Sequence, residues 1–590
     1  MCGIFGIVND KTNQAAQTVL EGLKKLEYRG YDSWGIAIIP NQSKIIQIEK
    51  RVGKIGQAKT TLPLGRIGIG HTRWATHGRV TDENAHPHLD CTQKIAVIHN
   101  GIVENHQQLR ESLKKKGHLF NSETDTEVIA HLIEEYKKTN QKIEKIVFSV
   151  FNELVGSNAI AVLDLDTQKI IACRNGSPLV IGVGNSQYFL GSDVPAFLKK
   201  TNEVYFVQDG EGIVLSKRGI NLYSLKTQKE RILKTQVLDW KLEDAEKGGY
   251  PHFLLKEIFE QKQTIPKTAD INEKEIFEIA KKINKGYKVI LTACGTASYC
   301  ALAAKYYLAA VGIESQAYGA YEFLPFARFC DNKTIVFAIS QSGETADTLI
   351  GAKTAKAHGS YIVAIVNARG STLERMADCV LPVGAGPEIA VVSTKAFTSQ
   401  LATLYLLINA VAGKYQQAKK RIKYLGRILN QWLDNKLQNK IVDLARLLIN
   451  QKHIYLVGKH LNYPAALEFA LKIKETSYIH AEPFAAGELK HGVITLIQKE
   501  TPCFVLSSND EVKREVFSSA AELKARGGHI IGISPINSNE FDTIIKTPDV
   551  GDLTIFPNVI VGQLLGYCLG VGRGTDPDKP RNLAKSVTVK

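Results

Sequence analysis

Two hydrophobic patterns divide the chain. Residues 2–225 contain many short apolar runs rich in β-branched residues, such as "GIAIIP" and "KIAVIHNGIV", and helical patterns intervene at about 14–26 and 124–138. Short Val- and Ile-rich runs between turn residues predict strands. This part of the chain therefore predicts a mixed α+β domain built from stacked antiparallel strands.

The second half alternates strands with helices, and its pattern occurs twice. "KVILTACG" corresponds to "HIYLVGKH", and "SYIVAIVN" corresponds to "GHIIGISP". Fully apolar strands alternating with helices predict parallel sheets covered on both faces. We therefore expect two doubly wound α/β domains at 270–415 and 440–575, after a charged, turn-rich connection over 226–269 and before a C-terminal tail at 576–590. Ligands of such sheets bind at the carboxyl ends of the strands.

Composition and charge exclude several classes of protein. The 74 Lys and Arg residues exceed the 59 Asp and Glu residues, giving a net charge of +15. The basic residues are dispersed and do not interleave with aromatic residues, so we expect a solvated basic surface and no nucleic-acid partner. No apolar run is long enough to span a bilayer, and no secretory signal pattern opens the chain. Nine cysteines without CxxC spacing argue against a zinc site and a disulfide framework, so we expect no metal and a cytoplasmic protein.

The first candidate nucleophile is Cys2, which directly follows the initiator methionine and opens a predicted core strand. Once Met1 is removed, Cys2 carries a thiol and a free α-amine, and the amine titrates near neutral pH. Such a residue holds a nucleophile and its base together. Position alone favours a structural cysteine in the core, so this interpretation depends on the other residues of the first domain.

Three further motifs of the first domain bear on this interpretation. Asn100-Gly101 lies between apolar runs, which is a strong hairpin signal, but the Asn100 amide and the Gly101 N–H could also form an oxyanion hole, and the two interpretations can coexist. Arg73 could clamp a carboxylate. Asp125 could pair with an ammonium group, or its segment could start a helix with Thr124 and Glu127 as a capping box. Together these groups would suit cleavage of the side-chain amide of glutamine.

The segments "CGIFGIV", "LEYRGYDS", "HTRWATHG", "HNGIVEN" and "SETDTE" resemble the glutaminase domain of class II amidotransferases. The resemblance implies an N-terminal nucleophile domain with an αββα arrangement over residues 2–225. It implies Cys2 as the nucleophile and Asn100 and Gly101 as the oxyanion hole. It also implies a glutamine site made of five residues: Arg73, Trp74, Thr76, His77 and Asp125.

Two stretches of the second half predict binding and proton transfer. "SQSGETADT" follows a strand and precedes a helix, and its donor side chains around Gly343 predict a phosphate cradle, although capping of the helix by Ser and Thr is the simpler alternative. The duplicate loop has Asp510 and Glu511, so we expect only the first copy to bind phosphate. Glu468, Lys472 and Glu475 share one helical face, either as a surface salt-bridge ladder or as acid–base groups for interconverting a ketose and an aldose.

The second half also resembles a known pair of domains. "ACGT", "SQSGETADT", "STKAFT", "KIKETSYIHAE", "AAGELKHG" and "RNLAKSVTV" are similar to the two sugar isomerase (SIS) domains of the isomerising glutamine–fructose-6-phosphate aminotransferase family, which also carry the glutaminase domain in this order. The implied sugar-phosphate site comprises Thr296, Ser340, Gln341, Ser342, Thr345, Val391 and Ser393. The implied catalytic groups are Glu475 for proton transfer between C1 and C2, His491 for ring opening, Lys472 as a supporting base and Lys585 as the lysine that binds the ketose. Ala297 stands where the family commonly has serine.

The resemblance implies conversion of fructose 6-phosphate and glutamine into glucosamine 6-phosphate and glutamate, as the first step of the hexosamine pathway. Ammonia would pass internally between the sites, no cofactor would be needed, and a homodimer would be the smallest active unit, since His491 would serve the neighbouring subunit. The alternatives are another sugar-phosphate or ATP-using amidotransferase and a non-catalytic SIS-domain sensor. A P-loop is absent and Cys2, Glu475 and Lys585 are all present, which favours the synthetic enzyme.

Overall fold

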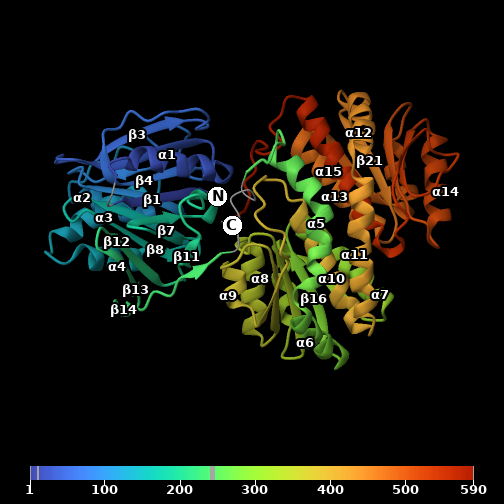
Figure 1. Ribbon diagram of the computed structural model, residues 1–590, viewed down its shortest axis with the longest axis horizontal. Helices are drawn as coiled ribbons and strands as arrows, with labels where there is room; N and C mark the ends of the chain where they lie inside the picture. Colours follow the sequence, from blue (N-terminus) through green and yellow to red (C-terminus); the bar gives the residue numbers. More distant parts are fainter. Residues whose placement is uncertain (1, 10–11, 239–245, 589–590) are drawn as a thin grey trace. The chain divides into compact units, whose positions relative to one another are not determined.

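The computed structural model describes residues 2–9, 12–238 and 246–588. The chain forms two compact units (Figure 1). Unit 1 comprises Met1–Ala245 with Ala584–Lys590, and unit 2 comprises Glu246–Leu583.

Unit 1 is built from two antiparallel sheets. The first sheet has the order β15-β11-β9-β10-β1-β4-β2-β3, and the second has the order β14-β13-β12-β8-β7-β6-β5. The strands of the first sheet are β1 (Gly3–Asn9), β2 (Ser33–Pro40), β3 (Gln47–Val52), β4 (Gly65–Arg73), β9 (Val180–Gly184), β10 (Gln187–Gly191), β11 (Glu203–Phe206) and β15 (Gln236–Val237). Those of the second are β5 (His88–Leu89), β6 (Ile95–Gly101), β7 (Asn158–Asp164), β8 (Lys169–Asn175), β12 (Glu211–Ser216), β13 (Gly219–Ser224) and β14 (Glu230–Arg231).

Helices cover the outer faces of both sheets. Side chains of both sheets, such as Ile4, Ile69 and Ile98, form one buried cluster between them. Helix α1 (Ala15–Leu26) packs on β1 and β4 of the first sheet, whereas α3 (Glu127–Lys137) and α4 (Ile143–Glu153) pack on the second sheet, and α2 (His106–Lys115) packs on α3. The layers are therefore αββα, which confirms the predicted fold class. The sequence pattern predicted α1 and α3 but missed α2 and α4.

Unit 2 contains two parallel sheets with the same strand order. The first has the order β17-β16-β18-β19-β20, and the second β22-β21-β23-β24-β25. The first sheet consists of β16 (Lys288–Ala293), β17 (Ser315–Gly319), β18 (Thr334–Ser340), β19 (Tyr361–Val366) and β20 (Cys379–Pro382). The second consists of β21 (His453–Gly458), β22 (His480–Ala485), β23 (Pro502–Leu506), β24 (His529–Ser534) and β25 (Thr543–Lys546). In both sheets the strand order reverses beside the strand that comes first in the sequence, β16 or β21. Doubly wound sheets bind ligands at such a switch point.

The helices of unit 2 join both sheets into one core. They are α5 (Phe253–Lys267), α6 (Glu273–Asn284), α7 (Thr296–Ala310), α8 (Ala346–Ala357), α9 (Thr372–Met376), α10 (Lys395–Val411), α11 (Tyr415–Trp432), α12 (Asn435–Leu448), α13 (Asn462–Ser477), α14 (Lys513–Lys524) and α15 (Ile555–Gly572). Leu291 of the first sheet and Leu456 of the second belong to the same buried cluster, together with residues of α5, α10, α13 and α15. The expected connection over 226–269 was predicted to lead into a helix at "LLKEIFEQ", and α5 confirms that helix and packs in this core.

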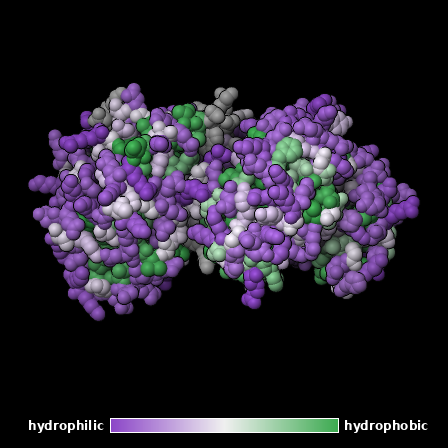
Figure 2. Space-filling model, turned by 90° about the horizontal axis from the view of Figure 1, so that it is seen from below, coloured by the Kyte–Doolittle hydropathy of each residue, from purple (hydrophilic) through white to green (hydrophobic). Residues whose placement is uncertain are grey.

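One helical segment of the described residues, 551–572, is long and apolar enough to cross a membrane by length and composition alone. Within its most apolar stretch, 89% is buried inside the protein. Its apolar character is therefore accounted for by packing, because α15 lies in the core of unit 2 against α13. The face of the molecule in Figure 2 is largely hydrophilic, and its apolar residues form separate groups.

Candidate active sites

The thiol of Cys2 lies at the start of β1 and faces the end of β4. The Trp74 backbone N–H donates to Cys2 Sγ at 3.2 Å, and the Trp74 carbonyl oxygen lies 3.5 Å from the same sulfur. Burial raises the pKa of the Cys2 thiol, while the Trp74 N–H and the Arg73 guanidinium act in the opposite direction. A thiol held by a backbone donor at a strand end can act as a nucleophile once a base removes its proton.

Asn100 is held beside Cys2 by a buried network. Its Nδ2 donates to the Cys2 carbonyl oxygen at 3.1 Å and to Ser192 Oγ at 3.0 Å, and its Oδ1 lies 3.0 Å from His71 Nε2. Burial lowers the pKa of His71 to about 3, so this imidazole is neutral and donates from Nε2. The structure therefore brings Asn100 to Cys2, and it shows that both hydrogens of the amide have partners within the protein.

The hairpin interpretation of Asn100-Gly101 is wrong. Both residues belong to β6, where Asn100 pairs with Ala159 and Gly101 with Asn158 of β7. Gly101 has φ of +136°, and a Cβ there would lie 2.2 Å from the Ser157 carbonyl oxygen. Glycine is therefore required by a strand end that closely approaches a neighbouring backbone, which is a different reason from a two-residue turn.

Arg73 organises the loop that follows β4. Its guanidinium is almost fully buried and donates to the carbonyl oxygens of His77, Gly78 and Arg79. This loop carries Thr76, which is exposed, and His77, whose ring meets that of His106 edge-on with the ring centres 5.7 Å apart. Arg73 thus shapes the segment in which a glutamine site was predicted.

Asp125 lies two residues before the start of α3 and is also buried. Its Oδ2 accepts the Val103 N–H at 2.7 Å. The predicted capping box with Thr124 is wrong, because α3 begins at Glu127 and its N-cap, Thr126, makes no side-chain cap. Glu127 instead accepts the N–H groups of Asn121 and Ser122. Its carboxylate therefore holds the loop that precedes Asp125, in place of the capping contact that was predicted.

In unit 2, two of the three charged groups on α13 are buried, and the third, Glu475, is partly buried. Glu468 is 0% exposed and Lys472 is 1% exposed. Lys472 Nζ lies 2.7 Å from Glu475 Oε2 and 3.4 Å from Glu468 Oε1. The surface-ladder interpretation is therefore wrong, and three ionisable groups share a site from which most water is excluded.

Lys472 also links α13 to the carboxyl end of β16 and to the loop before α10. Its Nζ donates to Thr296 Oγ1 at 2.9 Å and to the Ser393 carbonyl oxygen at 3.3 Å. Burial opposes its charge, but the carboxylates of Glu468 and Glu475 outweigh burial and raise the pKa of Lys472 to about 12. Burial raises the pKa of Glu468 to about 8, despite the nearby Lys472. The pKa values of Glu468 and Lys472 thus lie well apart. Neighbouring groups that titrate at different pH values suit acid–base chemistry.

The predicted phosphate loop follows β18 and leads into α8. Ser340 Oγ accepts the Gly343 N–H at 3.0 Å and lies 3.1 Å from Thr345 Oγ1, while Ser342 Oγ accepts the Glu344 N–H at 3.2 Å. Gln341 belongs to the same loop, and Gly343 has φ of +64°. The four donor side chains predicted from the sequence are therefore gathered on one turn at the start of a helix.

The equivalent loop of the second copy is occupied by its own carboxylate. Ser508 Oγ donates to Asp510 Oδ2 at 2.5 Å, and Asn462 Nδ2 donates to Ser508 Oγ at 2.9 Å. A carboxylate in this position repels an anion, which favours phosphate binding by the first copy alone.

The remaining predicted residues have different surroundings. Ser393 Oγ donates to Glu388, and Val391 is mostly buried in the same loop. His491 ends a short 3₁₀ helix, Ala486–His491, and is exposed. Lys585 belongs to the C-terminal segment that is grouped with unit 1. Lys472 of α13 thus contacts Thr296 and Ser393. None of the described interactions of Lys472 involves His491 or Lys585.

Several residues that organise these sites were not predicted. Ser192 and His71 hold Asn100, and Glu388 accepts the N–H groups of Thr394 and Ala396 at the start of α10. No local sequence signal identifies Ser192, because its partner is far away in the chain. Glu388 lies seven residues before α10, so it falls outside the first turn in which a carboxylate is expected from a capping pattern.

These two sites define a class of enzyme in which a thiol-dependent glutaminase is joined to a sugar-isomerase unit. The glutamine amidotransferase domain family matches residues 71–199, and the SIS domain family matches residues 282–410 and 447–547.

Comparisons over the full length identify the family more closely. The chain is 42% identical to glutamine–fructose-6-phosphate aminotransferase (isomerizing) of Thermococcus kodakarensis and to that of Pyrococcus horikoshii, with 100% of each chain covered in both cases. It is also similar to the solved C-terminal domain of glucosamine-fructose-6-phosphate aminotransferase from Francisella tularensis, with a TM-score of 0.51 and 32% identity over 57% of this chain and 99% of that one. The chain therefore belongs to the isomerising glutamine–fructose-6-phosphate aminotransferase family.

Proposed function

We propose that this chain converts fructose 6-phosphate and glutamine into glucosamine 6-phosphate and glutamate. The observation that carries the proposal is that one chain holds two separate reactive sites: Cys2 against Trp74 in unit 1, and the buried Lys472–Glu475 pair beside Thr296 in unit 2. Neither a glutaminase nor a sugar isomerase alone needs both. The similarity of the whole chain to relatives with this named activity supports the same reaction.

In unit 1, removal of Met1 exposes the α-amine of Cys2, which takes the thiol proton. The thiolate then attacks the carboxamide carbon of glutamine, ammonia leaves with that proton, and water hydrolyses the thioester to glutamate. Asn100 and Gly101 stabilise the oxyanion. For this role one Asn100 hydrogen must leave Ser192 or the Cys2 carbonyl for the substrate. Arg73, Trp74, Thr76, His77 and Asp125 bind the rest of glutamine.

In unit 2, the loop of Ser340, Gln341, Ser342 and Thr345 binds the phosphate with Thr296, Val391 and Ser393 nearby. Lys585, from the C-terminal segment grouped with unit 1, forms a Schiff base with the ketose carbonyl, and ammonia passed internally from the glutaminase site displaces it. Glu475 then moves a proton between C1 and C2. Lys472, 2.7 Å away, stabilises its carboxylate form as an ammonium group and does not act as the supporting base that the resemblance implied, because its pKa is raised to about 12. The reaction needs no cofactor.

We further propose a cytoplasmic homodimer. His491 is exposed on its short 3₁₀ helix, so it is available to open the sugar ring in the site of a neighbouring subunit. The product places the enzyme at the entry to amino-sugar synthesis.

The test combines intact mass with product analysis. We expect the purified protein to lack Met1 and to form glucosamine 6-phosphate from fructose 6-phosphate and glutamine. Cys2→Ala should form no product with glutamine but retain synthesis with a high concentration of ammonia, whereas the control Cys568→Ala should remain active. Glutamate release without amino sugar would refute the proposed sugar reaction, and no glutamate from protein lacking Met1 would refute the nucleophile.

A further inference from the structure

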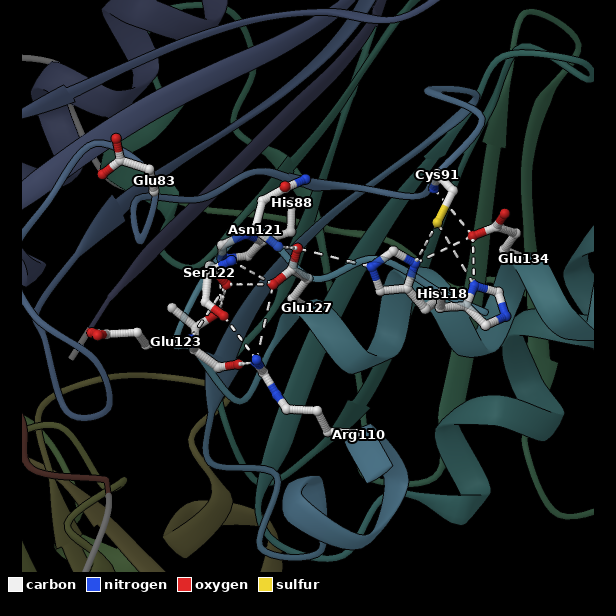
Figure 3. A network of polar contacts seen from close by, with 12 residues as sticks. Glu83, His88, Cys91, Arg110, His118, Asn121, Ser122, Glu123, Glu127 and Glu134 are labelled. Carbon is white, nitrogen blue, oxygen red and sulfur yellow. Dashed lines mark hydrogen bonds and ion pairs between the residues drawn. The ribbon is translucent and has the colours of Figure 1, made fainter. Parts of the chain in front are cut away.

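Unit 1 also brings a cysteine, two histidines and a glutamate together, away from the residues assigned above. Cys91 lies in the turn between β5 and β6, His118 follows α2, and His131 and Glu134 lie on α3. One ligand atom from each lies within 4.8 Å of all the others. Figure 3 shows Cys91, His118 and Glu134 directed toward one another. Their spacing in the sequence is unlike a CxxC motif, so only the fold reveals the cluster.

The distances within this cluster match those around a tetrahedral metal ion. Cys91 Sγ lies 3.6 Å from His131 Nδ1 and 3.9 Å from His118 Nδ1. Glu134 Oε2 lies 3.0 Å from His118 Nδ1 and 3.2 Å from His131 Nδ1. Zinc bonds of about 2.3 Å to sulfur and about 2.0–2.2 Å to nitrogen and oxygen separate neighbouring ligand atoms by roughly 3.3–3.6 Å in tetrahedral geometry. These four distances lie within a few tenths of an ångström of that geometry, and all the ligand atoms lie within 4.8 Å of one another.

The outer nitrogens of both imidazoles face carboxylates. His118 Nε2 lies 3.1 Å from Glu135 Oε2, and His131 Nε2 lies 3.8 Å from Glu127 Oε1. Metal-binding histidines commonly donate their second ring N–H to a carboxylate, which leaves the other nitrogen as a ligand. His118 fits this pattern, and the Glu127 carboxylate stands beside His131 Nε2 at ion-pair distance.

The four groups lie in a largely buried place, since His118 is 6% and His131 is 1% exposed. The ring centres of the two imidazoles are 5.2 Å apart. One divalent cation placed between the four ligand atoms would contact all of them, and exposed Cys91 provides a path of entry.

We propose that Cys91, His118, His131 and Glu134 bind one Zn²⁺ ion as a four-coordinate structural site. Mixed sulfur, nitrogen and oxygen donors in a tetrahedron suit zinc among the common metals. Binding displaces the thiol proton of Cys91 to solvent. The ion ties the β5–β6 turn and the segment after α2 to α3, the helix whose Glu127 holds the backbone of Asn121 and Ser122.

The test uses the full chain in a Cys2→Ala background, because the Cys2 thiol and amine could also bind metal. After treatment with a chelator, Zn²⁺ alone should bind with a stoichiometry of one, and Co²⁺ should give tetrahedral visible bands with a thiolate charge-transfer band. Adding Cys91→Ser should abolish that band and weaken zinc binding at least tenfold. The matched controls Cys568→Ser and His358→Gln should change neither. Zinc should also raise the unfolding temperature of the parent and not of the Cys91→Ser protein.

The proposal is overturned if zinc binds the parent no more tightly than it binds the Cys91→Ser protein, or if the cobalt spectrum lacks the thiolate band. Should Cys91→Ser fail to fold, Glu134→Gln provides the second comparison, with the same loss of affinity expected. These measurements do not depend on amino-sugar synthesis, so they separate failure of the zinc site from failure of the proposed function.

Discussion

Glu468 should make the stability of unit 2 depend on pH, and Glu468→Gln should remove that dependence. The carboxyl group is 0% exposed on α13, and burial raises its pKa from the ordinary value of 4.5 to about 8. Gln has nearly the same shape but does not titrate. The substitution therefore isolates the ionisation of one buried group from changes in packing.

The sign follows from proton binding. Because the folded-state pKa lies above the unfolded one, the folded protein binds more protons between about pH 4.5 and 8, and its stability falls as pH rises through this range. The shift corresponds to a loss of roughly 3–4 kcal/mol in the free energy of unfolding between about pH 5 and about pH 8, at 1.36 kcal/mol for each pKa unit. Lys472 remains protonated throughout, since its pKa is about 12.

Hydrogen exchange measured by mass spectrometry on peptides from α13 provides the assay. The ratio of exchange rates between Glu468→Gln and the parent, taken at each pH, cancels the intrinsic pH dependence of exchange. We expect the variant to protect the amides of α13 from exchange better than the parent does near pH 8. The ratio of protection between variant and parent should be larger near pH 8 than near pH 5. Glu278→Gln, at an exposed position of α6, is the control and should give a constant ratio. A constant ratio for Glu468→Gln as well would refute the buried ionisation.

Three further substitutions test separate parts of unit 2. Gly343→Ala should destabilise the phosphate loop by about 1–3 kcal/mol, because φ is +64° and the new Cβ would lie 2.1 Å from Ser371 Oγ. Its KM for fructose 6-phosphate should rise, whereas glutaminase activity measured as glutamate release should not change. Lys472→Met should lower amino-sugar synthesis at least 100-fold and destabilise unit 2 by about 3–5 kcal/mol in denaturant unfolding, because it leaves Glu475 without its buried partner; full synthesis by this variant would contradict the assigned role. Asp578 accepts the first two N–H groups of α5 at 3.0 and 2.8 Å. Asp578→Asn replaces this carboxylate with a neutral amide, so the unfolding free energy should fall by about 1 kcal/mol.

The sequence was sufficient to predict the architecture because both halves carry strong periodic signals. Strands of unit 2 are apolar on both faces and occur twice in the same order, and parallel pairing follows from that pattern. Helices α2 and α4 were missed in unit 1. Only Leu113 of α2 is buried, so that helix has little of the apolar stripe by which a helix is found in a sequence.

Local signals failed where distant segments decide the outcome. Asn100-Gly101 carries the residues of a tight turn, but pairing with β7 draws both into a strand and leaves Asn100 facing Cys2 and Ser192. Propensity measures what a short segment prefers by itself, and tertiary pairing outweighs that preference by adding backbone hydrogen bonds and burial. The residues that hold Asn100 come from other strands, so no local pattern could have named them.

The charges on α13 show why spacing alone cannot separate a surface feature from a catalytic one. The same four- and three-residue steps are compatible with a solvated ladder worth a few tenths of a kcal/mol per pair and with a buried triad. The difference lies in what covers the helix. In this fold α7 and α15 pack against α13, Thr296 and the Ser393 carbonyl receive Lys472, and the carboxyl group of Glu468 is sealed from water. Keeping a charged lysine between two carboxyl groups in such a place costs stability that apolar residues would not cost. A soluble core has no structural need for that arrangement. The burial of Glu468 and Lys472 beside the partly buried Glu475, more than the spacing of the three residues, is therefore the argument for proton transfer at Glu475.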